Sequence, residues 1–364
     1  VGSLYARFWE GPPSSRAAKL RRGHVAFVAQ RDTARDTTQR PGLELLRTMV
    51  AADLAAVNAE ILRRLDSRVS LIPQLARHLI AAGGKRIRPM LTLGCAKLCD
   101  YRGEHHVLLA ACVEFIHTAT LLHDDVVDES DRRRGNATAN AVWGNQPSVL
   151  VGDFLFTRAF QLMVEAKSLD VLATLANASA VIAEGEVLQL QAAGDTNTSE
   201  TAYFDIISAK TAALFAAACR VSGVLAGRPA RDIEALDSYG RELGIAFQLV
   251  DDALDYSAEQ ASLGKNIGDD FKEGKATLPM LLAYQRGDET ERAFWRRTIG
   301  RGEQQPGDLN AAIQLMTRHQ ALAETISRAR AHGARASAAL AVFPDSAAKD
   351  ALLDTVAFAV ERGY

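Results

Sequence analysis

The sequence has few cysteines, little net charge and no long apolar run, and each of these absences excludes a class of protein. The cysteines are too few for a disulfide scaffold and form no C-x-x-C pair; they are Cys95, Cys99, Cys112 and Cys219. A net charge of -2 argues against a nucleic-acid-binding protein, because phosphate backbones select an excess of Lys and Arg. No uninterrupted apolar run reaches the ~18 residues of a membrane span. We therefore expect a soluble, cytoplasmic protein with reduced, packed cysteines.

The N-terminal segment differs from the rest of the chain. Basic residues outnumber acidic ones there, and Pro12 and Pro13 interrupt any helix. A transit peptide is one interpretation, but its acidic residues and the lack of a clear amphipathic helix favour a disordered extension over residues 1–42. Further along, apolar residues recur at helical spacing, as in residues 54–65 and 107–122, and strand-like alternation is scarce. We expect a single all-α domain over residues 43–364, built as a large helical bundle.

Two copies of the motif D-D-x-x-D each follow an apolar helical stretch. Their aspartates are Asp124, Asp125 and Asp128 in the first copy and Asp251, Asp252 and Asp255 in the second. Residues four apart project from one face of a helix, so the outer two aspartates of each copy share a face. One copy alone fits a solvated helix end equally well. Two copies alter the balance, because each lies beside an apolar stretch where unpaired carboxylates would repel one another and be costly to bury. Divalent cations would remove that cost.

The ligand type indicates which cations these are. Carboxylate oxygens favour magnesium or calcium, and magnesium in particular is held by few carboxylates together with water and substrate phosphates. The two motifs therefore predict a diphosphate held between two facing acidic helices.

Short basic segments supply the positive charge that a diphosphate site needs. They are Lys85, Arg86 and Arg88 in GGKRIRP, Arg132, Arg133 and Arg134 before Gly135, Lys210 beside Thr211 in an apolar stretch, and Lys265 and Lys275 in a glycine-rich loop. Glycine lets the backbone approach a phosphate closely, and Arg grips it with two N–H groups. Taken singly, the first two segments also fit an ordinary loop or a solvated run, whereas an unpaired lysine in an apolar helix would be costly.

The glycine-rich loop is not a nucleotide-binding P-loop. Five residues instead of four separate Gly268 from Gly274, and Ala276 follows Lys275 where Ser or Thr is required. We therefore reject a nucleotide site.

Two neutral residues lie on the same helix faces as the acidic motifs. His117 precedes Asp124 by seven residues, which returns it to nearly the same side of a helix, and phosphate contact and core packing fit it equally well. Gln248 precedes Asp255 by seven residues and shares its face in the same way.

A series of motifs resembles the polyprenyl synthetase family from about residue 43 onward. In order they are GGKRIRP, LLHDDVVDES followed by RRG, GNQPSVLVGDFLF, EGEVLQL, AKTAALF, FQLVDDALDY and GKNIGDDFKEGKATLP. Their order and number carry the likeness, since a single D-D-x-x-D arises easily by chance. The resemblance implies an all-α bundle of the isoprenoid synthase type with a central apolar channel, and a homodimer, the commonest oligomer in general.

The resemblance also implies residue roles. It makes the acidic motifs the magnesium sites, with three ions when substrate is bound; the implied ligands are Asp124, Asp128, Asp251, Asp252 and Asp255, and Asp125 joins them as a catalytic residue. It assigns isopentenyl diphosphate to Lys85, Arg88, His117 and Arg134. It assigns the allylic diphosphate to Arg133, Lys210, Thr211, Gln248, Lys265 and Lys275, of which Lys210 is also catalytic. Arg132 departs from the family, where a neutral or apolar residue is expected.

The implied reaction adds isopentenyl diphosphate repeatedly to farnesyl or geranylgeranyl diphosphate after metal-assisted ionisation. Thr120 and Ile116 lie one and two turns before the first aspartate motif, with Ala119 beside them. In the family, bulky residues there close the product channel early, and Ala119 and Thr120 are small. We therefore expect a long product, and the overall resemblance implies an octaprenyl to decaprenyl chain for quinone side chains. The channel floor is left open among Phe160, Met163 and other residues further along.

Three other functions are alternatives. A shorter-chain synthase would stop at farnesyl or geranylgeranyl diphosphate. A class I terpene cyclase also uses D-D-x-x-D but needs no second diphosphate site, so GGKRIRP and RRG argue against it. A noncatalytic subunit of a heteromeric synthase would have lost aspartates or lysines, and none is lost here. Membrane contact is expected to be peripheral at most.

Overall fold

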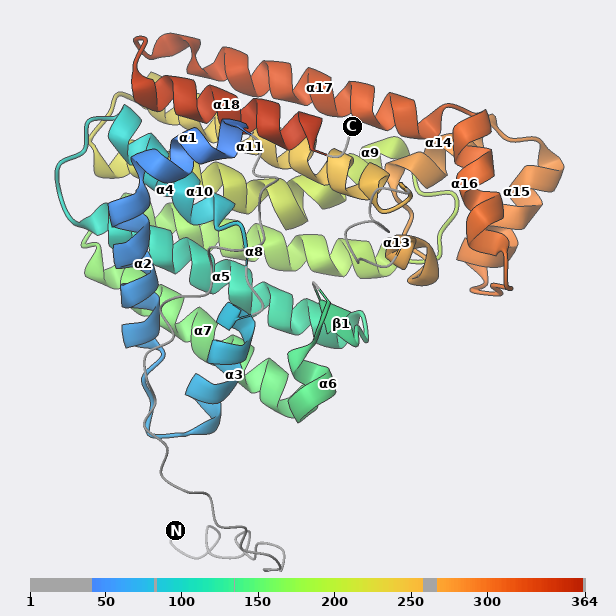
Figure 1. Cartoon of the computed structure of the whole chain (residues 1–364), viewed down its shortest axis with the longest axis horizontal. Coiled ribbons are helices and arrows are strands. Elements are labelled where there is room, and N and C mark those ends of the chain that lie inside the picture. Colours follow the sequence, from blue (N-terminus) through green and yellow to red (C-terminus); the bar gives the residue numbers. More distant parts are fainter. Residues whose placement is uncertain (1–40, 82–83, 134, 258–266, 363–364) are drawn as a thin grey trace, which may run out of the picture. The chain divides into compact units, whose positions relative to one another are not determined.

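The computed structural model describes residues 41–364 except residues 82–83, 134, 258–266 and 363–364. Arg134 and Lys265, which were predicted to bind the diphosphates, lie outside the described residues, as does most of the predicted N-terminal extension. The described part is almost entirely α-helical, as predicted (Figure 1). Its two short strands are β1 (Arg132–Arg133) and β2 (Asn136–Ala137), which pair antiparallel with Arg133 opposite Asn136.

The helices follow one another with short connections. The first group is α1 (Pro41–Met49), α2 (Ala51–Arg64), α3 (Leu71–Ala81), α4 (Ile87–Leu98), α5 (His105–Val127), α6 (Ala139–Trp143), α7 (Asn145–Glu165) and α8 (Leu169–Ala192). The middle group is α9 (Glu200–Ile207), the π-helical turn η1 (Ser208–Ala212), α10 (Ala213–Leu225), α11 (Ala230–Leu254) and α13 (Asp269–Lys272). The last group is α14 (Leu278–Arg286), α15 (Glu289–Trp295), η2 (Arg296–Gly300), α16 (Asp308–Arg318), α17 (Ala321–Ala339), η3 (Leu340–Val342) and α18 (Ala347–Glu361).

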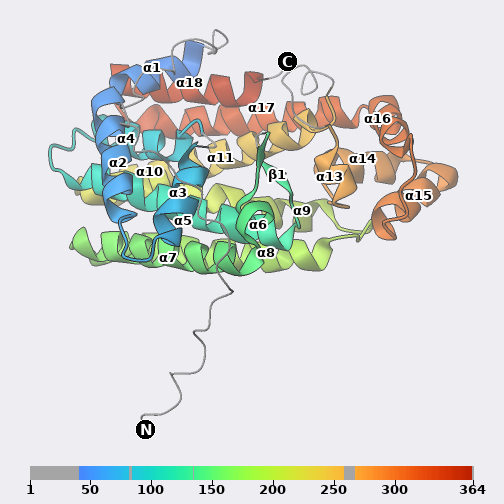
Figure 2. The ribbon, with the colours of Figure 1, turned by 60° about the horizontal axis from the view of Figure 1, so that its bottom comes forward.

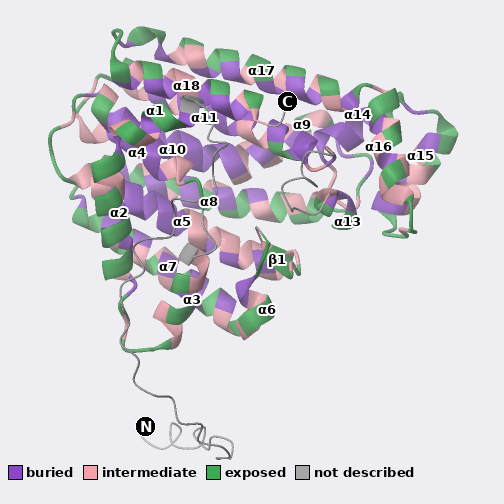
Figure 3. Ribbon diagram, viewed as in Figure 1, coloured by how far each residue is buried: buried purple, intermediate pink, exposed green. Residues whose placement is uncertain are grey.

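Helix α10 lies at the centre of the bundle. It packs against α4, α5, α8 and α11, and nearly all of its residues are buried (Figure 3). Small residues on α10 and its neighbours let the helices approach closely; a Cβ atom at Gly240 of α11, for example, would lie 2.4 Å from the carbonyl oxygen of Phe215. Helix α17 covers α11 on the outside, and α18 covers α1 and α4. Helices that are apolar on all sides are expected in such a core.

The two acidic motifs occupy equivalent places on α5 and α11. Each helix is largely buried along the apolar stretch that precedes its motif, and the third aspartate of each motif, Asp128 or Asp255, is the C-cap. The last carbonyl groups of a helix form the negative end of its dipole, so carboxylates at a C-terminus are electrostatically unfavourable. Both motifs therefore need nearby positive charge.

The cysteine prediction is confirmed, because all four cysteines are buried and free. The prediction that no segment suits a membrane span needs correction. Three helical segments are long and apolar enough to cross a membrane by length and composition: His105–Val127, Leu169–Ala192 and Glu200–Leu225. The sequence criterion missed them because single polar residues interrupt each apolar run. In the first and third, 56% of the apolar window is buried inside the bundle, against 33% for α8.

Candidate active site

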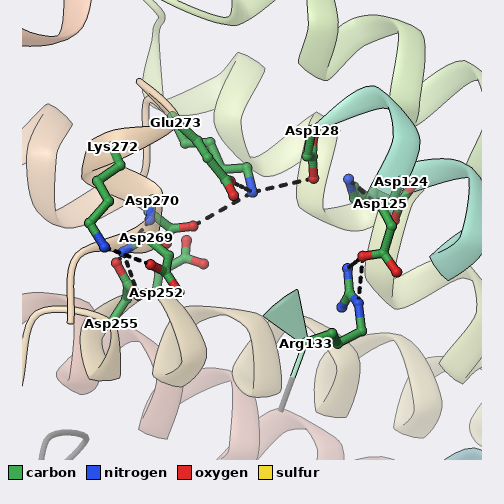
Figure 4. Close-up of polar contacts among 12 residues, drawn as sticks. Asp124, Asp125, Asp128, Arg133, Asp252, Asp255, Asp269, Asp270, Lys272 and Glu273 are labelled. Carbon is green, nitrogen blue, oxygen red and sulfur yellow. Dashed lines mark hydrogen bonds and ion pairs between the residues drawn. The ribbon is translucent and has the colours of Figure 1, made fainter. Parts of the chain in front are cut away.

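The first acidic motif lies across from the second (Figure 4), and two lysines lie beside the first motif. The Lys210 ammonium group lies 3.7 Å from Oδ2 of Asp124 and 2.7 Å from Oε2 of Glu186. From the other side, the Lys275 ammonium group lies 3.7 Å from Oδ2 of Asp128. Each outer carboxylate of the first motif thus has one lysine nearby.

Lys275 also connects the two motifs. Its ammonium group lies 3.8 Å from Oδ1 of Asp270, beside the second motif, and forms an ion pair with Glu273. Burial by itself would lower the pKa of Lys275. The negative charges of Asp270, Asp128 and Glu273 have a larger effect and raise this pKa above its ordinary value. Lys275 therefore carries its charge at all physiological pH values.

Asp125 is directed toward Arg133 on strand β1, as Figure 4 shows. Its Oδ1 accepts a 2.7 Å hydrogen bond from Nε of Arg133, and the side chain is almost fully buried. The amide nitrogen of Asn140 donates to the backbone carbonyl of Asp125 at 3.0 Å. Strands β1 and β2 therefore pair beside the acidic motif, with Arg133 bound to Asp125 and Arg132 exposed.

Asp252 is the buried centre of a hydrogen-bond network on the second motif. The Tyr203 hydroxyl donates to its Oδ2 at 2.5 Å, and the Gln248 amide donates to its Oδ1 at 2.7 Å. The Thr211 hydroxyl in turn donates to the Gln248 carbonyl oxygen at 2.9 Å. The network therefore ties η1, which carries Lys210 and Thr211, to α11.

Asp255 holds the segment that follows it. Its carboxylate accepts hydrogen bonds from the backbone N–H groups of Asp269 at 3.2 Å and Asp270 at 3.1 Å, the first two residues of α13. These contacts bring Asp270 beside the second motif, as Figure 4 shows. Asp251 is the exposed member of the motif; its side chain is 52% exposed and lies 3.4 Å from Nη2 of Arg362.

Two of the residues assigned to isopentenyl diphosphate, Arg88 and His117, meet near the start of α4. Arg88 lies over the ring of Phe215, 4.5 Å from its centroid, and its Nη1 is 3.2 Å from Nε2 of His117 on α5. Lys85 lies 4.9 Å from the ring centroid of Phe358 on α18. Arg88 and His117 are therefore paired between α4 and α5, and Lys85, three residues before Arg88 in the sequence, packs against α18.

Burial raises the pKa of several of these carboxyl groups. The pKa of Asp124 rises to about 7; Lys210 opposes the rise, and Glu186 and Asp128 add to it. Burial also raises the pKa of Asp252 to about 7, against the hydrogen bonds from Tyr203 and Gln248. The pKa of Asp255 rises to about 6 by burial, opposed by the Asp270 backbone N–H. The neighbouring positive charges and hydrogen bonds therefore offset only part of the effect of burial on these pKa values.

The raised pKa values predict a pH dependence for the metal-free protein. Between the ordinary aspartate pKa of 3.8 and the folded value of about 7, the folded state binds more protons at Asp124 than the unfolded state does. The free energy of unfolding therefore decreases as pH rises through this window, because the buried Asp124 carboxyl group must lose its proton. We expect Asp124→Asn to stabilise the protein relative to wild type at pH 7.5, measured by urea unfolding in EDTA, and much less at pH 4. A difference that is independent of pH would contradict this.

The donor set fits divalent cations. Asp124 and Asp128 supply oxygen ligands of the kind magnesium prefers, and lysine ammonium groups lie where positive charge is required. Within the described residues, no group of three or more His, Cys, Asp or Glu side chains could by itself hold a metal ion.

The predicted channel residues lie on α5 inside the bundle. Ile116 and Ala119 are fully buried, and Thr120 is half-buried with its hydroxyl donating to the His117 carbonyl at 2.9 Å. Of the residues considered for the floor, Met163 is fully buried, but Phe160 is 43% exposed on α7. Met163 is thus enclosed by the bundle, whereas part of the Phe160 side chain lies at its surface.

Sequence reasoning missed three residues of the site. Asp270 and Glu186 each lie within 4 Å of a site lysine, and Tyr203 binds Asp252. Asp270 and Glu186 fall within GKNIGDDFKEGKATLP and EGEVLQL, so the motifs contained them, but only the lysines of the loop were weighed. Nothing in the sequence singles out Tyr203.

The helical architecture and the site together define a bundle of the isoprenoid synthase type, in which two helices with acidic motifs lie across from each other and Lys275 lies near both motifs. Comparison with known proteins leads to the same class. Residues 69–316 match the family model described as polyprenyl synthetase. The octaprenyl diphosphate synthase of Escherichia coli (strain K12) is 49% identical over 320 residues, which are 88% of this chain and 99% of that protein.

Two solved structures are similar in sequence and fold. A polyprenyl synthase from Caulobacter crescentus CB15, complexed with calcium and isoprenyl diphosphate, has a TM-score of 0.86 and 53% identity, covering 89% of this chain and 99% of its own. A decaprenyl diphosphate synthase from Rhodobacter capsulatus has a TM-score of 0.85 and 54% identity, covering 88% and 99%. The chain therefore belongs to the polyprenyl synthetase family. The predicted fold and the predicted enzyme class, a prenyltransferase, are confirmed.

Proposed function

We propose that this chain adds isopentenyl diphosphate repeatedly to farnesyl or geranylgeranyl diphosphate and releases all-trans octaprenyl to decaprenyl diphosphate. The observation that carries the proposal is the pair of acidic motifs on α5 and α11, which lie across from each other (Figure 4), with Lys275 near Asp128 and Asp270 and Lys210 near Asp124. The basic group of Lys85, Arg88 and His117 gives a second diphosphate a separate site. Relatives named octaprenyl and decaprenyl diphosphate synthase, at 49% and 54% identity, support a long product.

Magnesium is the cation we propose, in three ions when substrate is bound. Asp124 and Asp128 would hold it on the first motif, and Asp251 and Asp255, with Asp252, on the second. Bound magnesium supplies Lewis-acid neutralisation of the charge that develops on a leaving diphosphate. The calcium in the Caulobacter crescentus structure supports a divalent-cation requirement.

The chain's own residues hold the leaving group and exclude water. Lys210 and Lys275 donate charged hydrogen bonds to the allylic diphosphate, assisted by Thr211 and Gln248, and we include Lys265 with them. Arg133, fixed by Asp125, approaches the same group from the hairpin. The buried face of α5 keeps water from the allylic cation, and the released diphosphate takes up the proton lost after each addition.

Isopentenyl diphosphate is held at the start of α4. Lys85, Arg88 and His117 bind its diphosphate, and we include Arg134 with them. Arg88 is restrained over the Phe215 ring and beside His117, which reduces the conformational entropy that it loses when it grips a phosphate.

Incorporation of isopentenyl diphosphate tests this function. We expect the purified protein with magnesium, farnesyl diphosphate and radiolabelled isopentenyl diphosphate to form a labelled product soluble in organic solvent. A terpene cyclase would consume farnesyl diphosphate alone, and a noncatalytic subunit would show no activity until a second chain is added. Either result would refute the proposal.

We also propose a homodimer, with α7 and α8 as the interface. These helices lie side by side along one face of the bundle (Figure 2). They expose many large apolar side chains, namely Val149, Leu150, Phe160, Val164, Leu169, Val187, Leu188 and Leu190. An apolar surface of this extent marks an interaction site, and a second copy of the chain is the occupant that a symmetric interface provides.

A charge within this face should separate the subunits. Val164 is 65% exposed in the single chain, so we expect Val164→Glu to leave the fold intact but to convert the dimer to a monomer in sedimentation velocity. Val69→Glu is the matched control, because Val69 is 59% exposed but lies outside α7 and α8. If wild type is a monomer, or if it binds phospholipid vesicles through this face, the dimer proposal fails.

We place the activity in the cytoplasm and infer that it serves quinone side-chain synthesis, with peripheral membrane contact at most. A long polyprenyl chain is insoluble in water, so the product must pass from the enzyme to a lipid bilayer. Dimerisation would cover the apolar face of α8, the least buried of the three long apolar helices.

A further inference from the structure

The π-helical turn η1 determines where Lys210 and Thr211 lie. It connects α9 to α10 in one continuous helical segment, and it packs against both α8 and α11. A π-helical turn contains one more residue than an α-helical turn, is rare, and often occurs at functional sites. The contacts of η1 with α8 and α11 are therefore important for where its residues lie.

Two glycines make these contacts possible from opposite sides. A Cβ atom at Gly185 of α8 would lie 2.8 Å from the backbone nitrogen of Lys210 and 2.8 Å from Cβ of Ala209. A Cβ atom at Gly244 of α11 would lie 2.7 Å from Cα of Ala212. These separations are shorter than van der Waals contact, so the backbone of η1 fits between α8 and α11 only with glycine at both positions.

Each glycine is followed by a side chain that holds a polar group of η1. On α11, Gln248 lies one turn after Gly244 and accepts the Thr211 hydroxyl. On α8, Glu186 is next to Gly185 and accepts a 2.7 Å hydrogen bond from the Lys210 ammonium group. This contact is shorter than the 3.7 Å separation between Lys210 and Asp124, so Glu186 is the main partner of the lysine.

We propose that Gly185 and Glu186 together position Lys210 for the allylic diphosphate. Gly185 admits the backbone of η1 against α8, and the Glu186 carboxylate restrains the long lysine side chain, which would otherwise lose much rotamer entropy on binding. Glu186 acts through Lys210 and is a positioning residue. The inference deepens the proposed function, because it depends on the diphosphate being the ligand of Lys210.

A double-mutant cycle tests this. We expect Glu186→Gln to raise the KM for farnesyl diphosphate by about tenfold or more, as loss of a supporting side chain does at other sites, and to leave the KM for isopentenyl diphosphate unchanged. In a Lys210→Ala background, Glu186→Gln should have no further effect. Glu184→Gln is the matched control, because Glu184 is exposed on the same helix. Effects of Glu186→Gln that add to those of Lys210→Ala would overturn the inference.

A binding measurement separates this inference from the proposed function. With magnesium and farnesyl thiolodiphosphate as a slowly reacting probe, Glu186→Gln and Gly185→Ala should both weaken binding in calorimetry, and Glu186→Asp should recover part of the loss. If Lys210→Ala does not weaken binding of the probe, the proposed role of Lys210 fails. If Lys210→Ala weakens binding but Glu186→Gln does not, only the positioning inference fails. Should Gly185→Ala not fold, the glutamate variants still decide.

Discussion

An Asp128→Asn enzyme is expected to add isopentenyl diphosphate about 10³-fold more slowly than wild type. Asp128 caps α5 and lies opposite Lys275, so its carboxylate is one of two on the first motif that would hold magnesium. Losing a cation ligand removes several kcal/mol of charge stabilisation, and each ~1.4 kcal/mol corresponds to a factor of ten in rate. Steady-state incorporation of radiolabelled isopentenyl diphosphate measures the effect.

The matched control is Asp131→Asn, which makes the same change in charge three residues further along at an exposed side chain. We expect wild-type rates for this variant, and a circular dichroism spectrum of Asp128→Asn that matches wild type. If Asp128→Asn retains more than about a tenth of the wild-type rate, the carboxylate does not contribute at the level expected of a metal ligand.

An Ala119→Phe enzyme is expected to release shorter products than wild type. Ala119 is fully buried on α5, a little more than one turn before Asp124, where the growing chain is expected to pass. A phenyl ring there would obstruct the channel after few additions, so the main product should shift toward farnesyl or geranylgeranyl diphosphate. Thin-layer chromatography of the dephosphorylated products measures the shift.

Destabilisation must be distinguished from obstruction in this variant. Enlarging a fully buried side chain costs about 1–3 kcal/mol, so Ala119→Phe is also expected to melt at a lower temperature. A partly unfolded population lowers the total rate, but it does not change the length of each product molecule. Wild-type product length from a slower Ala119→Phe enzyme would therefore refute the location of the channel.

Periodicity alone was sufficient to predict the helices that carry the site. The apolar stretches at residues 54–65 and 107–122 match α2 and α5 closely, and both aspartate motifs lie at helix C-termini, as their spacing after apolar runs indicated. Helical periodicity is a local property, so one chain segment is enough to reveal it. His117 and Gln248 lie on α5 and α11 as expected, and their contacts are with Arg88 and Asp252 rather than with the predicted Asp124 and Asp255.

Contacts between segments that are distant in the sequence could not be predicted from helical periodicity. Glu186 reaches Lys210 only because α8 packs against η1, and a π-helical turn leaves no pattern in an apolar sequence. Asp270 reaches the second motif because Asp255 binds the start of α13. The sequence identifies RRRG only as a short basic segment. The pairing of Arg133 with Asp125 depends on strands β1 and β2, whose four paired residues are too few to show strand alternation.

The most direct test of the account is to size the products that the purified protein makes from farnesyl diphosphate, isopentenyl diphosphate and magnesium. We predict octaprenyl to decaprenyl diphosphate as the main products, and none when EDTA removes the metal. A main product no longer than geranylgeranyl diphosphate, or product formation that continues in EDTA, would contradict the account.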